Sequence, residues 1–254
     1  MYNSIQDTVI IGKKVIYLPS CHSTNDIAAE LVRGGMFSEG TVVITDEQTK
    51  GRGQRGSVWL SPPGENLTFS LIITPEQVLI AEQFVISQAV ALGVSSYLKA
   101  RGLDAKIKWP NDIYIGQKKV CGTLIENSIQ GNSIVSSVIG IGVNINQRNF
   151  GDMRITSIGQ CLDRQLSLKE EFGELVRHLD RVYVRLRSGD FDSIRSEYLS
   201  HLFGYREKRY FRLQAGIVEG TLTGITAMGR LCLLVDGETE IREMDIKEIE
   251  WIWD

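Results

Sequence analysis

Two short segments carry residues whose types and spacing suit chemistry on an anion. The first alternates glycines with polar and cationic side chains: Gly51-Arg52-Gly53-Gln54-Arg55-Gly56. Glycines let backbone amides approach an anion closely, and Arg52 and Arg55 can each clamp carboxylate or phosphate oxygens with paired hydrogen bonds. The segment predicts a mobile loop that closes over a bound anion and excludes water. The alternative is a solvated turn with two surface arginines, and on the loop alone this is the commoner case.

The loop also fits better-known glycine patterns, but its surroundings exclude them. A dinucleotide-binding G-x-G-x-x-G loop must open a helix, whereas Pro62-Pro63-Gly64 follow here. A kinase glycine loop needs H-R-D and D-F-G triplets elsewhere, and the sequence has neither. A Walker A loop needs lysine followed by serine or threonine, whereas this chain has Gly56-Ser57-Val58.

The second segment, Lys108-Trp109-Pro110-Asn111-Asp112, gathers polar groups around a rigid turn at the start of a predicted hairpin. A two-residue turn at Gly116-Gln117 would place Tyr114 opposite Lys119 and Asp112 opposite Cys121. These four side chains would then share one face of the sheet, with Asp112 diagonal to Lys119.

A lysine on a buried sheet face is costly unless it has a partner. The partner of Lys119 is either Asp112, as a structural ion pair, or a negatively charged ligand, and the spacing alone does not decide between them. Gly122, just beyond Lys119, leaves room for a ligand or for close backbone packing.

Hydrophobic patterning predicts the elements that position these segments. Alternating or β-branched runs predict strands at Lys14–Leu18, Thr41–Thr45, Leu67–Thr74, Lys106–Trp109, Asp112–Ile115, Lys118–Glu126 and Ser133–Asn146. Helical spacing of apolar residues predicts helices at Ile27–Arg33, Pro75–Arg101, Leu168–Arg187 and Asp192–His201. Ser23 is expected to cap the first of these helices, together with Asp26 three residues later.

After Phe203-Gly204 the pattern changes to short β-like runs separated by glycine turns. This order predicts an α+β fold in two parts. The first, residues 1–203, is a catalytic domain with a mixed β-sheet flanked by helices. The second, residues 204–254, is a small SH3-like β-barrel domain.

Composition excludes several classes of protein. The net charge of −3 argues against a general nucleic-acid binder, which usually carries a basic excess. The four cysteines and three histidines are scattered and do not have the spacing of zinc ligands. The spacing of the cysteines is also not typical of a disulfide framework. The N-terminus lacks the apolar core of a signal peptide, and no run is long enough to span a bilayer. We therefore expect a cytoplasmic protein that binds no membrane and no nucleic acid.

Four motifs in order and spacing resemble the biotin–protein ligase family: Ser23-Thr24-Asn25; Gln48 with Gly51 to Gly56; Lys108 to Asp112 with Lys119 and Gly122; and Gly140-Ile141-Gly142-Val143-Asn144-Ile145-Asn146. The resemblance runs from about Lys14 to Asn146 and continues more weakly through the C-terminal β module. It implies that the protein activates biotin with ATP and Mg²⁺ as biotinyl-5′-AMP. It also implies transfer of the biotinyl group to a lysine of a biotin carboxyl carrier domain.

The resemblance carries roles to particular residues. The expected biotin contacts are Ser23, Thr24, Asn25, Gln48, Arg52, Gly53, Gln54, Lys119 and Gly122. The expected ATP contacts are Arg52, Arg55, Trp109, Asn111 and Asn144. Lys119 and Arg52 would offset the repulsion between the two reacting anions, Asp112 would position Lys119, and Mg²⁺ would lie near Asp112.

Two departures from the family pattern stand out. Many members carry arginine where this chain has Gln54, so containment of the reactive adenylate could differ. Fewer than two dozen residues precede Ser23, which predicts the short form without the DNA-binding repressor domain of some members. The resemblance is also compatible with a homodimer that forms through the sheets.

Several alternatives stay open on the sequence. One is a lipoate or octanoate ligase of the same superfamily, although its arginine pair leading into a glycine run differs from the loop at Gly51 to Gly56. Others are a relative that binds biotin without activating it and, against the acidic balance, a DNA-bound regulator. Ser23 could serve only as a helix cap. Trp59 and Trp109 are candidates for stacking against a ligand.

Overall fold

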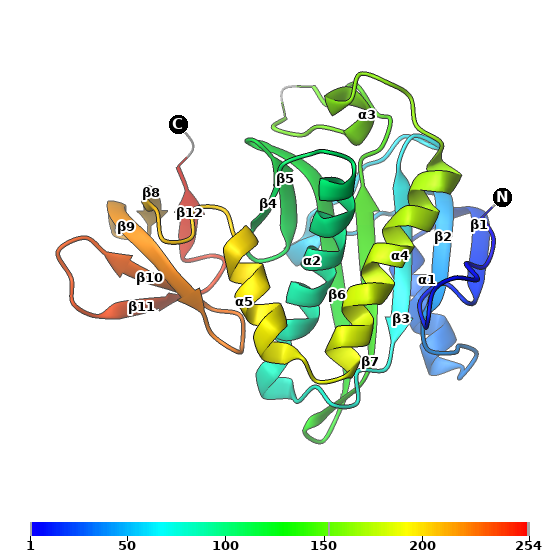
Figure 1. Cartoon of the computed structure of the whole chain (residues 1–254), viewed down its shortest axis with the longest axis horizontal. Helices are drawn as coiled ribbons and strands as arrows, with labels where there is room; N and C mark the ends of the chain where they lie inside the picture. The colour runs from blue at the N-terminus through cyan, green and yellow to red at the C-terminus, as the bar shows by residue number, and fades with distance from the viewer. Residues whose placement is uncertain (1, 152, 253–254) are drawn as a thin grey trace.

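The computed structural model describes residues 2–151 and 153–252, including every side chain in these ranges except that of Arg55. Within them the chain forms a seven-stranded mixed sheet and a five-stranded antiparallel sheet (Figure 1). The larger sheet has the order β1-β2-β3-β7-β6-β5-β4. Its strands are β1 (Val15–Cys21), β2 (Thr41–Gln48), β3 (Leu67–Ile73), β4 (Ala105–Lys108), β5 (Asp112–Ile115), β6 (Lys118–Gln130) and β7 (Ser133–Val143). Only the pairing of β1 with β2 is parallel among these strands.

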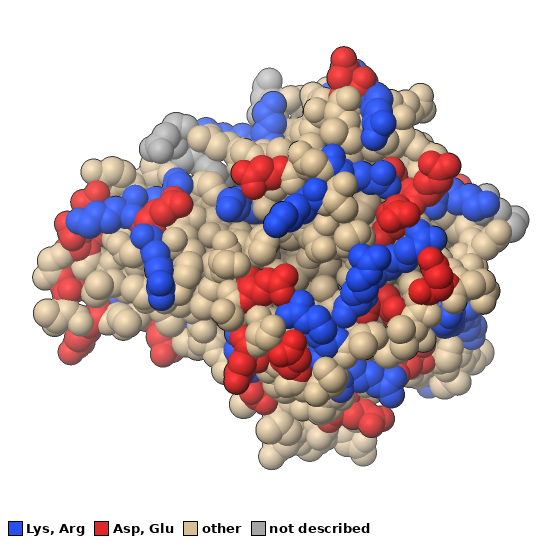
Figure 2. Space-filling model, in the orientation of Figure 1, with Lys and Arg blue, Asp and Glu red and all other residues tan. Residues whose placement is uncertain are grey.

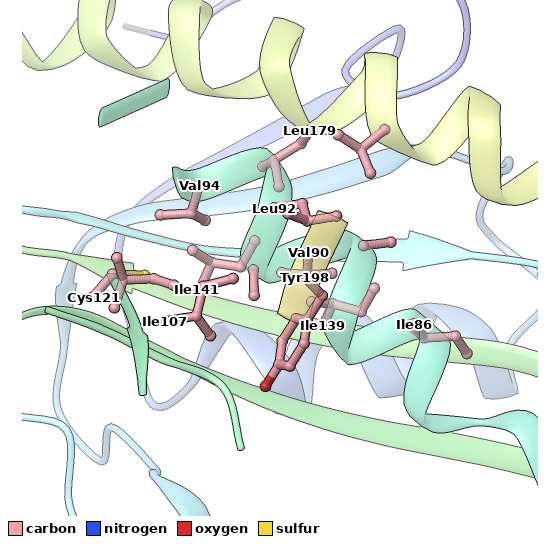
Figure 3. Close-up of a cluster of buried hydrophobic side chains, with 14 of the residues drawn as sticks. Ile86, Val90, Leu92, Val94, Ile107, Cys121, Ile139, Ile141, Leu179 and Tyr198 are labelled. Atoms are coloured by element: carbon pink, nitrogen blue, oxygen red, sulfur yellow. The ribbon is translucent and has the colours of Figure 1, made fainter. Parts of the chain in front are cut away.

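One face of this sheet is covered by helices and holds the main core. The helices are α2 (Phe84–Ala100), α4 (Leu168–Arg187) and α5 (Phe191–His201). A short helix, α3 (Ile158–Cys161), comes between α2 and α4 in the chain and lies at one end of the sheet (Figure 1). Side chains from α2, α4 and α5 interlock with alternate residues of the strands, such as Ile107, Ile139 and Ile141 (Figure 3). Burial of this apolar surface is the main source of the domain's stability.

The opposite face is covered in part by α1 (Thr24–Arg33). Ala28 of this helix packs against Val43, Ile72 and Val138, which point away from the main core because side chains alternate along a strand. The neighbouring part of this face, over β3, β6 and β7, carries the candidate site described below. The fold therefore has a fully packed side and a side that is left partly open.

The second sheet has the order β11-β10-β9-β8-β12, with strands β8 (Lys208–Leu213), β9 (Gly216–Ile225), β10 (Leu231–Val235), β11 (Ile241–Met244) and β12 (Ile249–Trp251). It packs against the first part of the chain, and the ring of Trp251 lies 5.6 Å from that of Phe203 and 5.1 Å from that of Phe211. The predicted α+β class, with a mixed sheet followed by a small β module, is confirmed. The boundary at residue 204 remains a prediction, and residues 253–254 of the predicted barrel lie outside the described residues.

The start of one helix was predicted wrongly. The helix expected from Pro75 begins at Phe84, because residues 74–82 form turns and a single 3₁₀ turn, η2 (Ile80–Glu82). In this segment Val78 is fully buried in the core and Leu79 pairs with Ser133. Tertiary packing therefore overrides the helical start signal.

The predicted register of the β5–β6 hairpin was half right. Tyr114 lies opposite Lys119 as expected, but a bulge after Ile113 places Ile113, not Asp112, opposite Cys121. Asp112 pairs with Lys108 of β4 instead. An inserted residue shifts the register of a hairpin in a way that side-chain patterning does not reveal.

The surface on the helical face mixes charges of both signs. Figure 2 shows Lys and Arg side chains interspersed with Asp and Glu across this face, without a broad area of one sign. Among the described residues, no helix is both long enough and apolar enough to cross a bilayer.

Candidate active site

A hollow of about 200 Å³ lies on the open face of the large sheet, beside the start of α1. It collects predicted residues from four separate segments of the chain. These are Ser23, Thr24, Asn25, Gln48, Arg52, Gly53, Gln54, Asp112, Lys119 and Gly122. Lys119 and Arg52, which the prediction required to share a cavity, both line it. Four further residues line it: Trp59, Thr68, Gly140 and Gly142.

The floor of the hollow is flat because three of its sheet positions are glycines. Gly142 of β7 pairs with Gly122 of β6, and Gly140 lies two residues before it on the same face. A side chain at Gly142 would overlap the indole of Trp59, and one at Gly140 would overlap the amide of Asn25. The glycine-rich motif on β7 therefore makes room for two side chains that lie across the sheet.

Trp59 is a site residue that the sequence suggested only as a candidate for stacking. Its ring lies over Gly142, and the ammonium nitrogen of Lys119 is 6.0 Å from the ring centroid. Its indole nitrogen is buried and has no hydrogen-bond partner among the described residues. A buried donor in this state is costly unless a ligand or water accepts from it.

Lys119 forms an ion pair with Asp112, and the Nζ–Oδ1 distance is 2.7 Å. The two side chains are 27% and 28% exposed, so solvent reaches the pair from the hollow. The backbone of Lys119 is fixed by hydrogen bonds to Arg154 and Thr156 on the adjacent segment. Both interpretations of Lys119 therefore hold in part: it has a structural partner, and it also faces a space that a ligand can enter.

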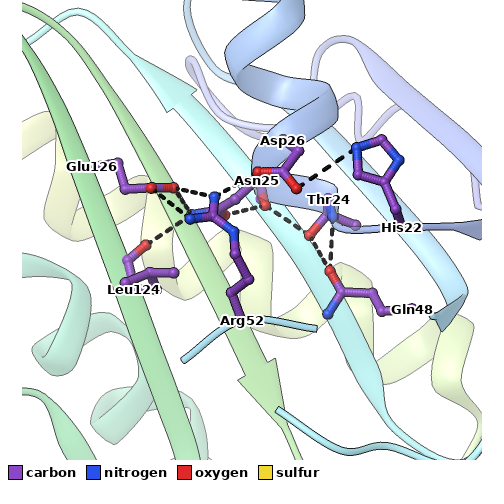
Figure 4. A network of polar contacts seen from close by, with 9 residues as sticks. His22, Thr24, Asn25, Asp26, Gln48, Arg52, Leu124 and Glu126 are labelled. Atoms are coloured by element: carbon purple, nitrogen blue, oxygen red, sulfur yellow. Dashed lines mark hydrogen bonds and ion pairs between the residues drawn. The ribbon is translucent and has the colours of Figure 1, made fainter. Parts of the chain in front are cut away.

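A network of hydrogen bonds joins the start of α1 to the glycine–arginine loop (Figure 4). The backbone amide and hydroxyl of Thr24 both donate to Oε1 of Gln48, at 2.7 and 3.1 Å. The hydroxyl of Ser70 donates to Oδ1 of Asn25 at 2.6 Å and lies 2.8 Å from Oγ1 of Thr24. On its other side, the amide nitrogen of Asn25 donates to Oε2 of Glu126 at 2.7 Å.

Arg52 ends this network between two carboxylates. Its guanidinium donates to both oxygens of Glu126, at 3.0 and 2.9 Å, and to Oδ1 of Asp26 at 2.6 Å. These partners raise the pKa of Arg52, and the hydrogen bond to Glu126 is the largest cause. Ser23 occupies the predicted N-cap position of α1, but its side chain makes no cap hydrogen bond, and Asp26 pairs with Arg52.

The sequence did not identify Ser70, Glu126 or Asp26 as members of the site. A signal existed only for Ser70, which with Thr68 is one of two polar residues in the strand Leu67–Ile73. A fully buried hydroxyl in such a strand must bond to something on its own face. Glu126 and Asp26 look like ordinary surface acids in the sequence.

Three predicted ATP contacts lie outside this hollow. Trp109 and Asn111 line a second hollow, which also contacts residues 228–230 of the C-terminal part. Both have partners there: the indole nitrogen of Trp109 donates to the Gly229 carbonyl at 2.9 Å, and the Asn111 amide donates to Thr123 at 2.8 Å. Gln54 lines both hollows and so connects them.

Asn144 is the third predicted ATP contact outside the first hollow, and it does not line the second hollow either. Its side chain is buried, and its amide donates to the Thr156 carbonyl at 3.1 Å. This hydrogen bond joins the residue that follows β7 to Thr156, whose backbone amide in turn donates to the Lys119 carbonyl. The side chain of Arg55, also an expected ATP contact, lies outside the described residues.

Comparison with known proteins gives consistent matches. Residues 17–144 match the model of the biotin/lipoate A/B protein ligase family. The bifunctional ligase/repressor BirA of Bacillus subtilis strain 168 is 32% identical over 94% of this chain and 75% of its own length. The biotin–[acetyl-CoA-carboxylase] ligase of Paracoccus denitrificans is 38% identical over 48% of this chain and 51% of its own.

The fold matches as well. The biotin protein ligase of Aquifex aeolicus, solved in complex with biotin and ATP, superposes with a TM-score of 0.77 at 27% identity. The match covers 94% of this chain and 98% of that one. With the motifs, the hollow and the fold in agreement, the chain belongs to the biotin/lipoate A/B protein ligase family.

Proposed function

We propose that this chain is a biotin–protein ligase, which activates biotin with ATP and transfers the biotinyl group to a lysine of a biotin carboxyl carrier domain. The observation that carries the proposal is that Lys119 and Arg52, from distant segments, line one hollow with Ser23–Asn25 and Gln48. The relative from Paracoccus denitrificans is named a biotin–[acetyl-CoA-carboxylase] ligase, and the one from Bacillus subtilis a bifunctional ligase/repressor, which supports the same activity.

In the first half-reaction a carboxylate oxygen of biotin attacks the α-phosphorus of ATP, and the bond to the β-phosphate oxygen breaks to release pyrophosphate. Two anions must approach each other, so positive charge must offset their repulsion. Lys119 would contact the carboxylate and the α-phosphate, and Asp112 would hold its ammonium group in place. The backbone of the loop at Gly51 to Gly56 would supply further donors.

In the second half-reaction the amine of the acceptor lysine attacks the carbonyl carbon of biotinyl-5′-AMP. The bond to the phosphate oxygen breaks, AMP leaves, and the amine loses a proton as the amide forms. Lys119 would stabilise the oxyanion that develops on the carbonyl oxygen. The mixed anhydride is open to hydrolysis until then, so the loop and Trp59 would shield it from water.

The polar wall at the start of α1 would bind the biotin ring system. Thr24, Asn25 and Gln48 present hydroxyl and amide groups that are already held by one another. A preorganised polar wall costs little further ordering when a ligand binds. The unpartnered indole N–H of Trp59 would be available to an acceptor on the ligand.

Magnesium is expected to accompany ATP. Asp112 is the carboxylate on the hollow that would serve as a ligand, and the described residues contain no group of three or more potential metal ligands. This donor set fits Mg²⁺, which keeps several waters and is bound largely through nucleotide phosphates. When bound, the ion would neutralise charge on the phosphates as pyrophosphate leaves.

Specificity for biotin over lipoate is tested by ATP–pyrophosphate exchange, because exchange reports adenylate formation directly. Biotin should drive exchange, and lipoate or octanoate should not; exchange driven by lipoate alone would overturn the assignment. Mass spectrometry of a carrier domain incubated with the protein, biotin, ATP and Mg²⁺ should then show a single added biotinyl group. Sedimentation with and without biotin would measure whether the chain forms the expected homodimer.

A further inference from the structure

The carboxylate of Glu126 connects Asn25 and Arg52, two residues of the hollow whose side chains have no hydrogen bond to each other among the described residues. One of its oxygens accepts from the amide of Asn25 at 2.7 Å and from Arg52 at 2.9 Å. The other accepts from Arg52 at 3.0 Å. One side chain on β6 thus bonds both the wall at the start of α1 and the glycine–arginine loop (Figure 4).

The contacts of Asn25 hold its side-chain amide in one orientation, with the nitrogen toward Glu126. Its amide oxygen accepts from Ser70, and its amide nitrogen also lies 3.3 Å from the Leu124 carbonyl, so the side chain is fixed in one orientation over Gly140. Its nitrogen therefore points toward Glu126. Any movement of Asn25 changes where the carboxylate can sit, and with it the position of Arg52.

Arg52 depends strongly on this carboxylate for its position. Its side chain is 42% exposed and belongs to a glycine-rich loop, so little else holds it. The paired hydrogen bonds to Glu126 fix the plane of the guanidinium, whereas Asp26 contributes a single hydrogen bond. Glu126 on β6 therefore sets most of the orientation of the Arg52 guanidinium.

We propose that Glu126 is a positioning residue that couples occupation of the biotin wall at Asn25 to the placement of the Arg52 loop. The inference rests on the proposed function and adds a residue to it. When biotin fixes Asn25, Glu126 is fixed as well, and the loop is held in the orientation that covers the ligand. Without the coupling, Asn25 and Arg52 should each still contact the ligand, but independently of each other.

The test uses biotin affinity, measured by calorimetry without ATP, together with KM and kcat for ATP–pyrophosphate exchange. Glu126→Gln keeps the size of the side chain but removes its charge and one of its two acceptor atoms, so the side chain can no longer hold the guanidinium of Arg52 by paired hydrogen bonds while it bonds Asn25. We expect biotin to bind about tenfold more weakly, as for loss of a charge-assisted hydrogen bond, and KM for biotin to rise more than kcat falls.

Glu82→Gln is the matched control. Glu82 pairs with Arg195 at 2.7 Å with similar exposure, 31% compared with 40% for Glu126, and it lies outside the hollow. It should leave biotin affinity and exchange unchanged. Asp26→Asn is the second control, because the Asp26 carboxylate bonds Arg52 but, in the part of the chain that the structure describes, makes no hydrogen bond to the side chain of Asn25. It should weaken biotin binding less than Glu126→Gln does.

A double-mutant cycle decides whether the role is coupling and not merely structural. The effects of Asn25→Ala and Arg52→Ala on biotin affinity should be non-additive by about threefold or more in the native background, and additive in the Glu126→Gln background. Additive effects in the native background would overturn the proposal, and this arm holds even if Glu126→Gln does not fold. Unaltered biotin affinity in a folded Glu126→Gln variant would overturn it too. Either result leaves the ligase assignment standing, whereas a native protein without biotin-driven exchange would refute the assignment itself.

Discussion

The ammonium group of Lys119 lies 2.7 Å from Oδ1 of Asp112, and both side chains line the same hollow as Arg52. The pair is neither buried nor fully solvated. A partly exposed ion pair of this kind contributes little to stability, because water screens it and competes for both groups. An arriving anion can therefore share Lys119 with Asp112 at small cost, which suits a lysine that must serve two successive reactions.

Replacing Lys119 with alanine should abolish most adenylate formation. Loss of one electrostatic contact to the developing charge costs on the order of 10²–10³-fold in rate. ATP–pyrophosphate exchange measures this step, and calorimetry should show that biotin still binds. Lys118→Ala is the control, since Lys118 is exposed on the same strand. Unchanged exchange in the Lys119→Ala variant would disprove the role of Lys119.

Replacing Gly142 with alanine should displace Trp59 from the floor of the hollow. The added methyl group would overlap the indole, so the ring must tilt into the space that the ligand needs. We expect KM for biotin to rise about tenfold, equivalent to ~1.4 kcal/mol of binding free energy. Tryptophan fluorescence should shift as well. In the control, Gly224→Ala, the methyl group meets no atom within 4 Å, and both readouts should stay at the native value.

The large elements of the fold could be predicted because their patterns are long and periodic. The α4 helix was predicted at Leu168–Arg187 and occupies these residues, since its apolar side chains recur at helical spacing. The start of α2 was predicted wrongly at Pro75. There the burial of Val78 and the pairing of Leu79 with Ser133 decide the structure, and neither is visible in a local pattern.

The residues of the site that belong to sequence motifs could be predicted. Lys119, Arg52 and Gln48 line one hollow as expected, although the direct role of each remains a prediction. Glu126 could not be found, because its importance comes from the two partners that the fold brings to it. Asn144 carries a family motif, yet here its amide is engaged with Thr156.

Stability should rise with pH across the titration of His178. Burial is the main cause that lowers the pKa of this imidazole below its usual 6.5, and Arg181 adds to the effect. The unfolded chain therefore binds a proton at His178 more readily than the folded chain, so folding is disfavoured as pH falls through 6.5 and below. Urea unfolding between about pH 5 and about pH 7 should show this rise in midpoint.

The His178→Asn variant should show a flatter dependence of the urea midpoint on pH. His201→Asn serves as its control, because it replaces a partly exposed histidine at the end of α5, and its slope should be steeper than that of His178→Asn. Equal slopes for the native chain and His178→Asn would show that other groups set the dependence.

Asp180 should be a large contributor to stability although it is remote from the site. Its carboxylate is 3% exposed and accepts hydrogen bonds from the backbone amides of Val9, Ile10 and Ile11, at 2.6 to 2.8 Å. Asp180→Ala leaves these amides without their acceptor and should cost about 3 kcal/mol, lowering Tm by roughly 6–12 °C. Asp192→Ala, at a fully exposed acid, should change stability by less than about 0.5 kcal/mol. Calorimetric melting distinguishes the two.

Gln54, the expected departure from the family pattern, lines both hollows. A neutral amide there cannot form an ion pair with the phosphate of biotinyl-5′-AMP, whereas an arginine could clamp it with paired hydrogen bonds. Gln54→Arg should therefore slow escape of the adenylate about tenfold, as for one charge-assisted hydrogen bond. Biotin attached to lysines of a bystander protein such as albumin measures the escape. Gln130→Arg adds the same charge at an exposed site on β6, away from both hollows, and should leave bystander labelling as it is. Equal labelling by the native chain and the Gln54→Arg variant would mean that the loop backbone and Trp59, not the side chain at this position, retain the adenylate.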